Sequence, residues 1–241
     1  MKRIASLIAL ALLVAPAAAV AQIHQVSSSS DSHSTVNFTL GYFALRGVES
    51  RVDDDVLVAD LLNQHPLLFE VNDFNGAVFS GEYLLAFGRH VEAGVGLGFS
   101  QKSVQTVYAD LTHSSGDEIN QELKLRQIPV TFTGRFLILP RGSKVEPYIG
   151  GGIVAIRYQY SEVGEFVDGQ GNIFPNVYKV NGTTAGPIVL LGARAPVGRW
   201  TVGGEMRWQR AEASGLAAEG FLGDKLDLGG WTTNFTFGVR F

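Results

Sequence analysis

The sequence predicts an all-β fold, namely an eight-stranded antiparallel up-and-down transmembrane β-barrel with short turns at one end and long loops at the other. Eight segments alternate apolar and polar residues with a period of two, which is the pattern of a strand with two unlike faces. Each segment is about ten or more residues long, which suits a tilted membrane crossing. The connections alternate between short and long, as in barrels that cross a membrane.

The chain begins with a stretch typical of a secretory signal peptide. Lys2 and Arg3 precede the apolar run IASLIALALLV, and an A-x-A cleavage site follows at Ala19 and Ala21. The run is too short for a comfortable transmembrane helix. We therefore expect residues 1–21 to be removed, so that the mature protein begins at Gln22. Residues 22–34 are polar and predict a flexible periplasmic lead, so that the barrel itself spans residues 35–241.

Composition excludes several classes of protein. The formal net charge is −4, and no run of basic residues occurs, which argues against a nucleic-acid partner. The chain has no cysteine, so neither a disulfide framework nor a lipid anchor on a terminal cysteine is possible. Glycine is abundant, at 29 residues, while charged residues make up only 17%, which is unlike an ordinary soluble surface. After the signal peptide no segment has eighteen apolar residues in a row, so no membrane-spanning helix is expected.

The first four strands follow from alternation in residues 35–46, 75–87, 91–100 and 127–138. The third is the clearest, because five apolar residues alternate there with Glu92, Ser100 and three glycines. Just before the fourth segment, Leu123 and Leu125 have the opposite parity. We therefore expect a β-bulge near Arg126.

The last four strands are predicted within residues 146–160, 185–195, 200–210 and 231–241. In the fifth, Arg157 is expected to face the barrel interior. The residues of that strand expected to face lipid are Tyr148, Val154, Ile156, Tyr158 and Tyr160.

The predicted connections are short around residues 88–90, 140–144 and 196–199. They are long, and rich in Asp, Glu, Gly and Ser, at residues 47–73, 106–122, 162–181 and 212–230. Short periplasmic turns and long extracellular loops are the asymmetry of outer-membrane barrels, and an even strand number puts both termini in the periplasm.

The first long loop predicts an amphipathic helix from about Asp53 to Gln64. Asp53 would cap it, and Pro66 would end it. The apolar stripe of this helix is expected to consist of Val58, Leu61 and Leu62, packed over the barrel mouth or onto a partner.

The composition of the second, less apolar face of the strands distinguishes a membrane barrel from a soluble one. A water-facing surface would be crowded with Lys and Glu, but this face consists mainly of Gly, Ser and Thr with a few charges of both signs. Small residues suit the narrow interior of an eight-stranded barrel, so the apolar face must point to lipid. Aromatic residues near the strand ends predict two interfacial girdles: Tyr158, Tyr160, Trp208 and Trp231 near the long loops, and Phe87, Phe136, Tyr148, Trp200 and Phe241 near the short turns.

Charged residues on the interior parity predict a polar network that fills the lumen. A buried charge is costly unless it is paired, and eight strands leave only enough width for side chains. The expected members are Glu82, Glu92, Arg135, Glu146, Arg157, Arg194, Glu205, Arg207 and Arg240.

The C-terminal stretch WTTNFTFGVRF resembles the recognition signal that the barrel-assembly machinery reads on outer-membrane proteins, carried here by Trp231, Phe235, Phe237, Val239 and Phe241. With GEYLLAFGRHVEAGVGLGFS and VEPYIGGGIVAIRY, it makes the chain similar to the OmpA-like eight-stranded outer membrane protein β-barrel domain family. The resemblance implies the cell outer membrane as location. No peptidoglycan-binding domain follows Phe241, so we expect no tether to the cell wall.

Three classes of function remain open. We expect a structural or surface-interaction barrel, with a narrow pore or hydrophobic-solute conduit as the alternative and a lipid-modifying enzyme as a weaker one. The loop sequence THSSGDE contains His113, two serines and Asp117, but adjacent residues on a loop do not hold a catalytic geometry. Neither the acidic run at Asp53 nor Asp168 has the ligand spacing of a calcium loop, so no catalytic residue, cofactor or metal is expected. The expected partners are outer-membrane lipid, lipopolysaccharide, the assembly machinery and an unknown extracellular ligand.

Overall fold

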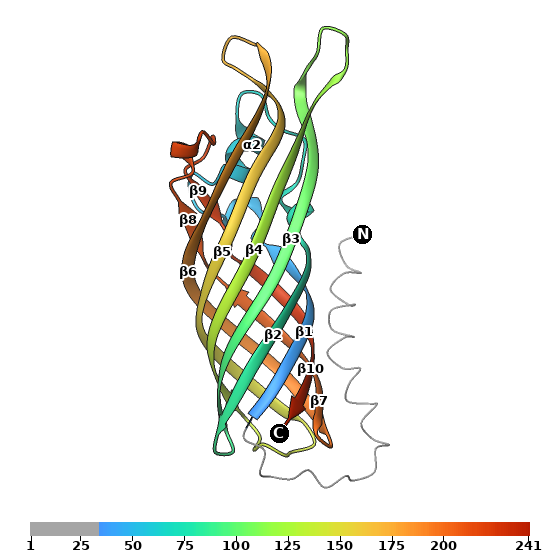
Figure 1. Cartoon of the computed structure of the whole chain (residues 1–241), viewed down its shortest axis with the longest axis vertical. Helices are drawn as coiled ribbons and strands as arrows, with labels where there is room; N and C mark the ends of the chain where they lie inside the picture. Colours follow the sequence, from blue (N-terminus) through green and yellow to red (C-terminus); the bar gives the residue numbers. More distant parts are fainter. Residues whose placement is uncertain (1–33) are drawn as a thin grey trace.

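The computed structural model describes residues 34–241, so the signal peptide and residues 22–33 of the predicted lead lie outside the described residues. Ser34, the last residue of that predicted lead, is already in a strand. Eight antiparallel strands form a closed barrel in which each strand pairs with its neighbours in sequence, and the last strand pairs with the first (Figure 1). The predicted fold class is confirmed. The barrel strands are β1 (Ser34–Leu45), β2 (Gly76–Phe87), β3 (Val91–Thr112), β4 (Glu118–Leu137), β5 (Glu146–Val167), β6 (Ile173–Val197), β7 (Trp200–Gln209) and β10 (Gly230–Arg240).

The barrel closes between β1 and β10. Their register runs from Thr35 opposite Arg240 to Leu45 opposite Gly230. Beyond this ladder, Ser34 and Phe241 exchange two backbone hydrogen bonds of 3.2 and 3.1 Å. The final residue is therefore part of the sheet.

The wall of the barrel is taller on one side than on the other. Strands β3 to β6 have 20 to 25 residues, whereas β1, β2, β7 and β10 have 10 to 12. Two hairpins therefore rise above the rest of the barrel (Figure 1). The prediction of long loops at residues 106–122 and 162–181 is therefore wrong. Most of each segment is strand, and only residues 113–117 and 168–172 form the turns.

The two remaining long connections fold against the inner side of this tall wall. Loop 1 (residues 46–75) contains the helical segments η2 (Val48–Ser50), α2 (Val56–Leu62) and η3 (Val71–Phe74). Loop 4 (residues 210–229) contains β8 (Glu212–Ser214), η4 (Ala217–Glu219) and β9 (Lys225–Asp227). Arg51 joins the two loops, because its guanidinium pairs with Asp55 and donates to the carbonyl of Asp227 at 2.8 Å. Both loops contribute to one buried apolar cluster with the upper parts of β3 to β6.

The helix in loop 1 exists, but it is shorter than expected. Asp55, not Asp53, is the N-cap, and its carboxylate accepts hydrogen bonds from the amides of Leu57 and Val58. Asp55 is buried, whereas Asp53 is exposed. The predicted stripe is only partly confirmed. Leu61 packs against the apolar cluster, but the buried face consists of Val56, Leu57 and Asp60, and Leu62 is 74% exposed.

An apolar belt covers the outside of the lower barrel. It includes Phe38 and Leu40 on β1, Phe132 on β4 and Phe235 on β10, all more than half exposed. On the tall strands the outward side chains change from apolar to polar after Phe99, Ile128, Ala155 and Ala185, which marks the upper edge of the belt. Among residues 34–241, no helix has the length and hydropathy needed to cross a membrane.

Three sequence expectations fail on β4 and β5. Tyr148, Val154, Ile156, Tyr158 and Tyr160 point inward and are buried, so the three tyrosines are not part of the girdles. The register of β4 with β3 and β5 continues through Arg126 without a bulge, and Leu123 and Leu125 also point inward. The reason is that loops 1 and 4 cover an apolar upper interior. The inward residues of these strands are therefore apolar in the upper part of the barrel, and apolar parity alone does not identify the lipid side.

Candidate functional site: the barrel interior

The interior of the barrel has two chemically different halves. Charged side chains from β2 to β7 and β10 fill the half near the short turns. Apolar side chains fill the half near the long loops, where they join the cluster formed with loops 1 and 4. Alternation explains this placement, because residues of one parity on every strand point inward.

The polar half contains an inner cluster of two acids and two bases. Arg135 on β4 pairs with Glu82 on β2 and, at 2.9 Å, with Glu205 on β7. Arg207 pairs with the same two carboxylates, at 3.2 Å from Glu82. Thr133 donates to Glu82 at 2.9 Å. Each carboxylate therefore contacts both guanidinium groups.

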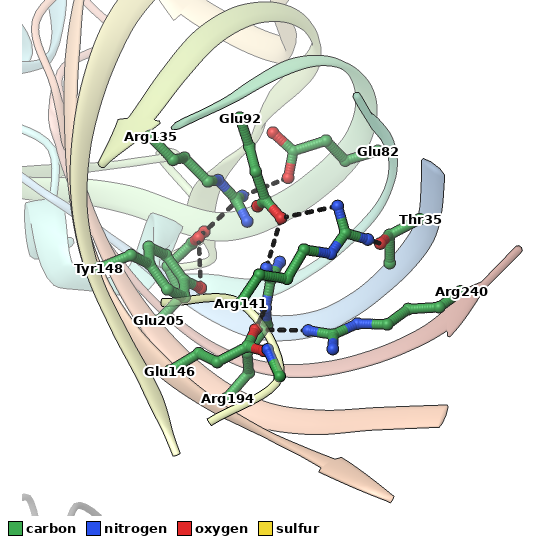
Figure 2. A network of polar contacts seen from close by, with 11 residues as sticks. Thr35, Glu82, Glu92, Arg135, Arg141, Glu146, Tyr148, Arg194, Glu205 and Arg240 are labelled. Atoms are coloured by element: carbon green, nitrogen blue, oxygen red, sulfur yellow. Dashed lines mark hydrogen bonds and ion pairs between the residues drawn. The ribbon is translucent and has the colours of Figure 1, made fainter. Parts of the chain in front are cut away.

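A second cluster lies nearer the short turns (Figure 2). Arg194 on β6 bridges Glu92 at 2.5 Å and Glu146 at 2.8 Å. Arg240 on β10 also pairs with Glu146. Arg141, which the sequence did not single out, reaches in from the β4–β5 turn, where its Nη2 donates to Thr35 at 3.1 Å and its Nη1 lies 3.5 Å from Glu92.

Tyr148 connects the two clusters. Its hydroxyl donates to Glu205 at 2.9 Å, and its ring lies 4.8 Å from the guanidinium carbon of Arg135 and 5.8 Å from that of Arg194. Glycine makes room for it, because a Cβ at Gly192 would lie 2.6 Å from the phenol. The prediction that Tyr148 is an interfacial anchor is therefore wrong. The signal that could have placed it inside is the parity it shares with Glu146.

Arg157 is a correction to the predicted network. It has the opposite parity from Glu146, points outward from β5 and is exposed. The other eight residues lie in the interior and are brought together by ion pairs.

The packing of the polar half leaves little free space. The side chains of Arg135, Glu146 and Glu205 are 0% exposed, so these charges are shielded from solvent. A cavity of about 40 Å³ lies above them, lined by residues such as Arg207, Thr131 and Asn234 and, on the apolar side, by Phe43 and Ile188. Above that cavity the apolar cluster and loops 1 and 4 close the mouth.

Two carboxyl groups are buried together in the apolar half. Asp60 on α2 and Glu162 on β5 are almost fully buried, above the upper edge of the belt, and each has a carboxyl oxygen without a hydrogen-bond partner in residues 34–241. Burial raises the pKa of Glu162 to about 7. Burial and then the negative charge of Glu162 raise the pKa of Asp60 well above its ordinary value. This pair was not identified from the sequence, because it joins a loop helix to a strand.

The other chemical candidates do not assemble into a site. His113 contacts Glu165 at 2.9 Å, while the hydroxyl of Ser115 donates to Asp117 at 2.8 Å, so the serine and the histidine have separate partners. The carboxylate of Asp168 accepts hydrogen bonds from the backbone amides of Gln170 and Asn172, so this segment forms a turn. Among residues 34–241, no group of three or more His, Cys, Asp or Glu side chains is placed to hold a metal ion.

The residues of the C-terminal stretch share the outer face of β10. Trp231, Phe235, Phe237 and Phe241 are exposed there, and Val239 is half-buried. The ring centroid of Phe241 lies 6.4 Å from that of Tyr83 on β2. The stretch therefore contributes to the apolar belt.

The chain matches no protein-family model and no curated protein. It is similar to solved structures of small barrels. These are the N-terminal β-barrel domain of Pseudomonas aeruginosa OprF (10% identity, 87% of this chain and 98% of that one, TM-score 0.42), Ail of Yersinia pestis (12%, 87% and 99%, 0.43) and Neisserial surface protein A (12%, 86% and 97%, 0.47). Because these TM-scores are low, the fold assignment rests on the strand register of this chain itself.

Proposed function

We propose that this protein is an integral barrel of the outer membrane with a structural or surface-interaction role and a lumen closed by its polar network. The observation that carries the proposal is the two-sided wall, which has its apolar side chains outside and its paired charges inside. A continuous exposed apolar belt of this size needs lipid to cover it, because water-soluble proteins expose only small apolar patches. A soluble barrel would have its apolar side chains inside and its charged side chains outside.

The orientation follows from the same asymmetry. Short turns face the periplasm in barrels of this kind, and the longer connections face outside. In this orientation, the hairpins β3–β4 and β5–β6, with loops 1 and 4 packed between them, are the surface that an extracellular ligand would meet. Phe241 would lie at the periplasmic edge, where the assembly machinery would read it.

A hydrophobic-solute conduit is the second candidate, and one observation favours it. The upper interior is apolar, with Val154, Ile156 and Ile188 lining it above the polar clusters. Transport would require loops 1 and 4 to move, because their own apolar residues occupy the mouth. The scattered His, Ser and Asp contacts favour no catalytic role.

Location and orientation can be tested with single cysteines, because the chain has none of its own. In intact cells a membrane-impermeant maleimide should label Ser114→Cys at a hairpin tip and spare Lys144→Cys in a short turn. After the membrane is permeabilised, both should react. Leu97→Cys on the belt should stay unlabelled in both conditions, because a thiol in lipid does not ionise. Recovery of the protein in the soluble periplasmic fraction, or rapid labelling of Leu97→Cys, would contradict the proposal.

A further inference from the structure

The outer face of the tall wall carries a group of basic side chains just above the belt. Register places these outward positions in three rows across the strands, and the rows contain four bases and no carboxylate. The rows, from the belt upward, are Ile128–Arg157–Thr183, Gln101–Arg126–Gln159–Asn181 and Ser103–Lys124–Ser161–Lys179. We call Lys124, Arg126, Arg157 and Lys179 the basic patch.

The charges of the basic patch are not neutralised by the protein. None of the four lies within 4.0 Å of a carboxylate in residues 34–241, whereas the interior arginines are each paired. The first outward acid, Glu122, lies one row farther from the belt. Arg157 and Lys179 are exposed, and Lys124 and Arg126 are half-buried. In a chain of net charge −4, this is a local excess of positive charge on the outer face.

The neighbours of the basic patch point to an amphiphile. Below it, the rows Val130–Ala155–Ala185 and Phe132–Ile153–Pro187 are apolar. The guanidinium of Arg126 lies 5.7 Å from the ring centroid of Phe99 in the belt, so this charge is held at the apolar edge. Arg126 and Arg157 are diagonal neighbours on adjacent strands, at positions roughly 7–8 Å apart, so both guanidinium groups can reach one phosphate.

We infer that the outer face of β4 to β6 binds an outer-leaflet lipid with a phosphorylated sugar headgroup. Arg126, Arg157 and Lys124 bind the phosphate oxygens, since guanidinium groups form two parallel bonds to phosphate. Gln159 and Asn181 offer amides to sugar hydroxyls in the same rows. The acyl chains lie on the apolar rows below. This inference rests on the proposed function, because it requires the upper edge of the belt to face the outer leaflet.

The test uses the folded barrel in phosphatidylcholine nanodiscs, with bisphosphorylated lipid A as the probe and native mass spectrometry as the readout. The site variant is Lys124→Gln/Arg126→Gln/Arg157→Gln. The control is Arg89→Gln/Lys144→Gln/Arg199→Gln, which removes the same charge from exposed positions at the short-turn end. The site variant should lose roughly tenfold or more of its lipid A affinity, because it lacks three charges that attract the phosphorylated headgroup, while the control should bind as the wild type does.

Several outcomes would overturn the inference. Equal retention by the site variant and the wild type would show that the basic patch does not bind the lipid. Equal loss in both variants would show only a general effect of charge. Full competition by millimolar inorganic phosphate would assign the site to a free anion. Heat-modifiable migration reports whether each variant is folded. A wild-type barrel that inserts but does not bind lipid A contradicts this inference alone. A wild-type chain that fails to insert contradicts the proposed function.

Discussion

Arg207 shows how the charges inside the barrel depend on one another. It contacts both Glu82 and Glu205, and all three side chains are buried. Arg207→Glu would place a third carboxylate against the other two, so we expect the free energy of unfolding to fall by roughly 3–5 kcal/mol. Urea titration of the barrel in lipid vesicles, followed by gel mobility, measures this loss.

The control for Arg207 is Arg89→Glu. It makes the same charge change at an exposed turn residue, and its effect should stay within about 0.5 kcal/mol. Similar losses in the two variants would mean that net charge, not pairing, determines stability.

Phe241 combines a backbone role with a side-chain role, and these can be separated. Its main chain bonds to Ser34, and its ring lies on the outer face near Tyr83. Deleting Phe241 should reduce the folded barrel at the cell surface and leave unfolded chain behind. Phe241→Ala keeps the backbone bonds, so a defect of similar size there would assign the effect to the aromatic ring. Heat-modifiable migration and surface labelling measure both, and normal levels in the deletion would contradict the prediction.

Sequence reasoning placed single residues well where the two faces of a strand differ in polarity. Eight of the nine proposed network residues lie inside. Arg157 was misplaced because the apolar residues beside it on β5 point inward, toward the cluster formed with loops 1 and 4. Arg141 was missed because a turn residue has no strand parity to read.

The helix α2 depends on its cap, and the structure assigns that cap to Asp55. Asp55→Ala removes two hydrogen bonds to the helix amides and leaves the buried Arg51 without its carboxylate partner, which should cost roughly 3–5 kcal/mol of local stability. Amide exchange through Val56–Leu62 should accelerate accordingly. The control is Asp53→Ala, which removes an exposed carboxylate two residues before the cap and should leave the amide exchange unchanged. Slow exchange in Asp55→Ala would contradict the capping role.

The Asp60–Glu162 pair makes the docking of α2 depend on pH. The titratable groups that interact with this pair are Asp55 at the N-cap of α2, Tyr160 on β5 and Tyr108 on β3, and none of them supplies a positive charge. Both carboxyl groups have raised pKa values in the docked form, so docked protein holds protons that undocked protein releases. Docking should therefore weaken as pH rises above about 4.5. The contribution of Glu162 is lost as the pH passes about 7, and that of Asp60 is lost as the pH passes its own raised pKa. The shift of the Glu162 pKa alone accounts for a loss of roughly 3 kcal/mol in the free energy of docking.

Amide exchange of Leu57 and Val58 between pH 4.5 and 8.5 measures this dependence. Asp60→Asn/Glu162→Gln should slow the exchange most at the highest pH, and comparison at each pH cancels the intrinsic effect of hydroxide. Glu122→Gln, on the outer face of the same wall, is the matched control. A ratio between variant and wild type that does not change with pH would refute the dependence.

At the level of elements, alternation identified all eight strands but not their full length. The extensions of β3 to β6 have polar side chains outside and apolar or acidic ones inside, next to loops 1 and 4. Alternation there does not follow the pattern of a lipid-facing strand, and the composition resembles that of a loop. The basic patch was equally invisible, because its four residues come from three strands and no two are adjacent in sequence.

The whole barrel should not conduct ions. The two polar clusters block the lower half, and the apolar cluster blocks the upper half, so we expect no steady conductance in planar bilayers. The Arg207→Glu variant, if it inserts, should leak, because repulsion among the carboxylates opens the inner cluster. A well-defined channel in the wild type, unchanged by this reversal, would disprove the plug.

The pairing of β1 with β10 has a consequence for how the molecule is made. The strand synthesised first finds one of its two partners only when the last residues have been added. Until then, the unfinished sheet has two free edges whose unpaired amides and carbonyls can pair with any other extended chain. Such an edge is an aggregation hazard, and the contacts that remove it are the most distant in sequence, so they are slow to form. Before β1 and β10 have paired, the chain should therefore be prone to aggregate unless these two edges are covered.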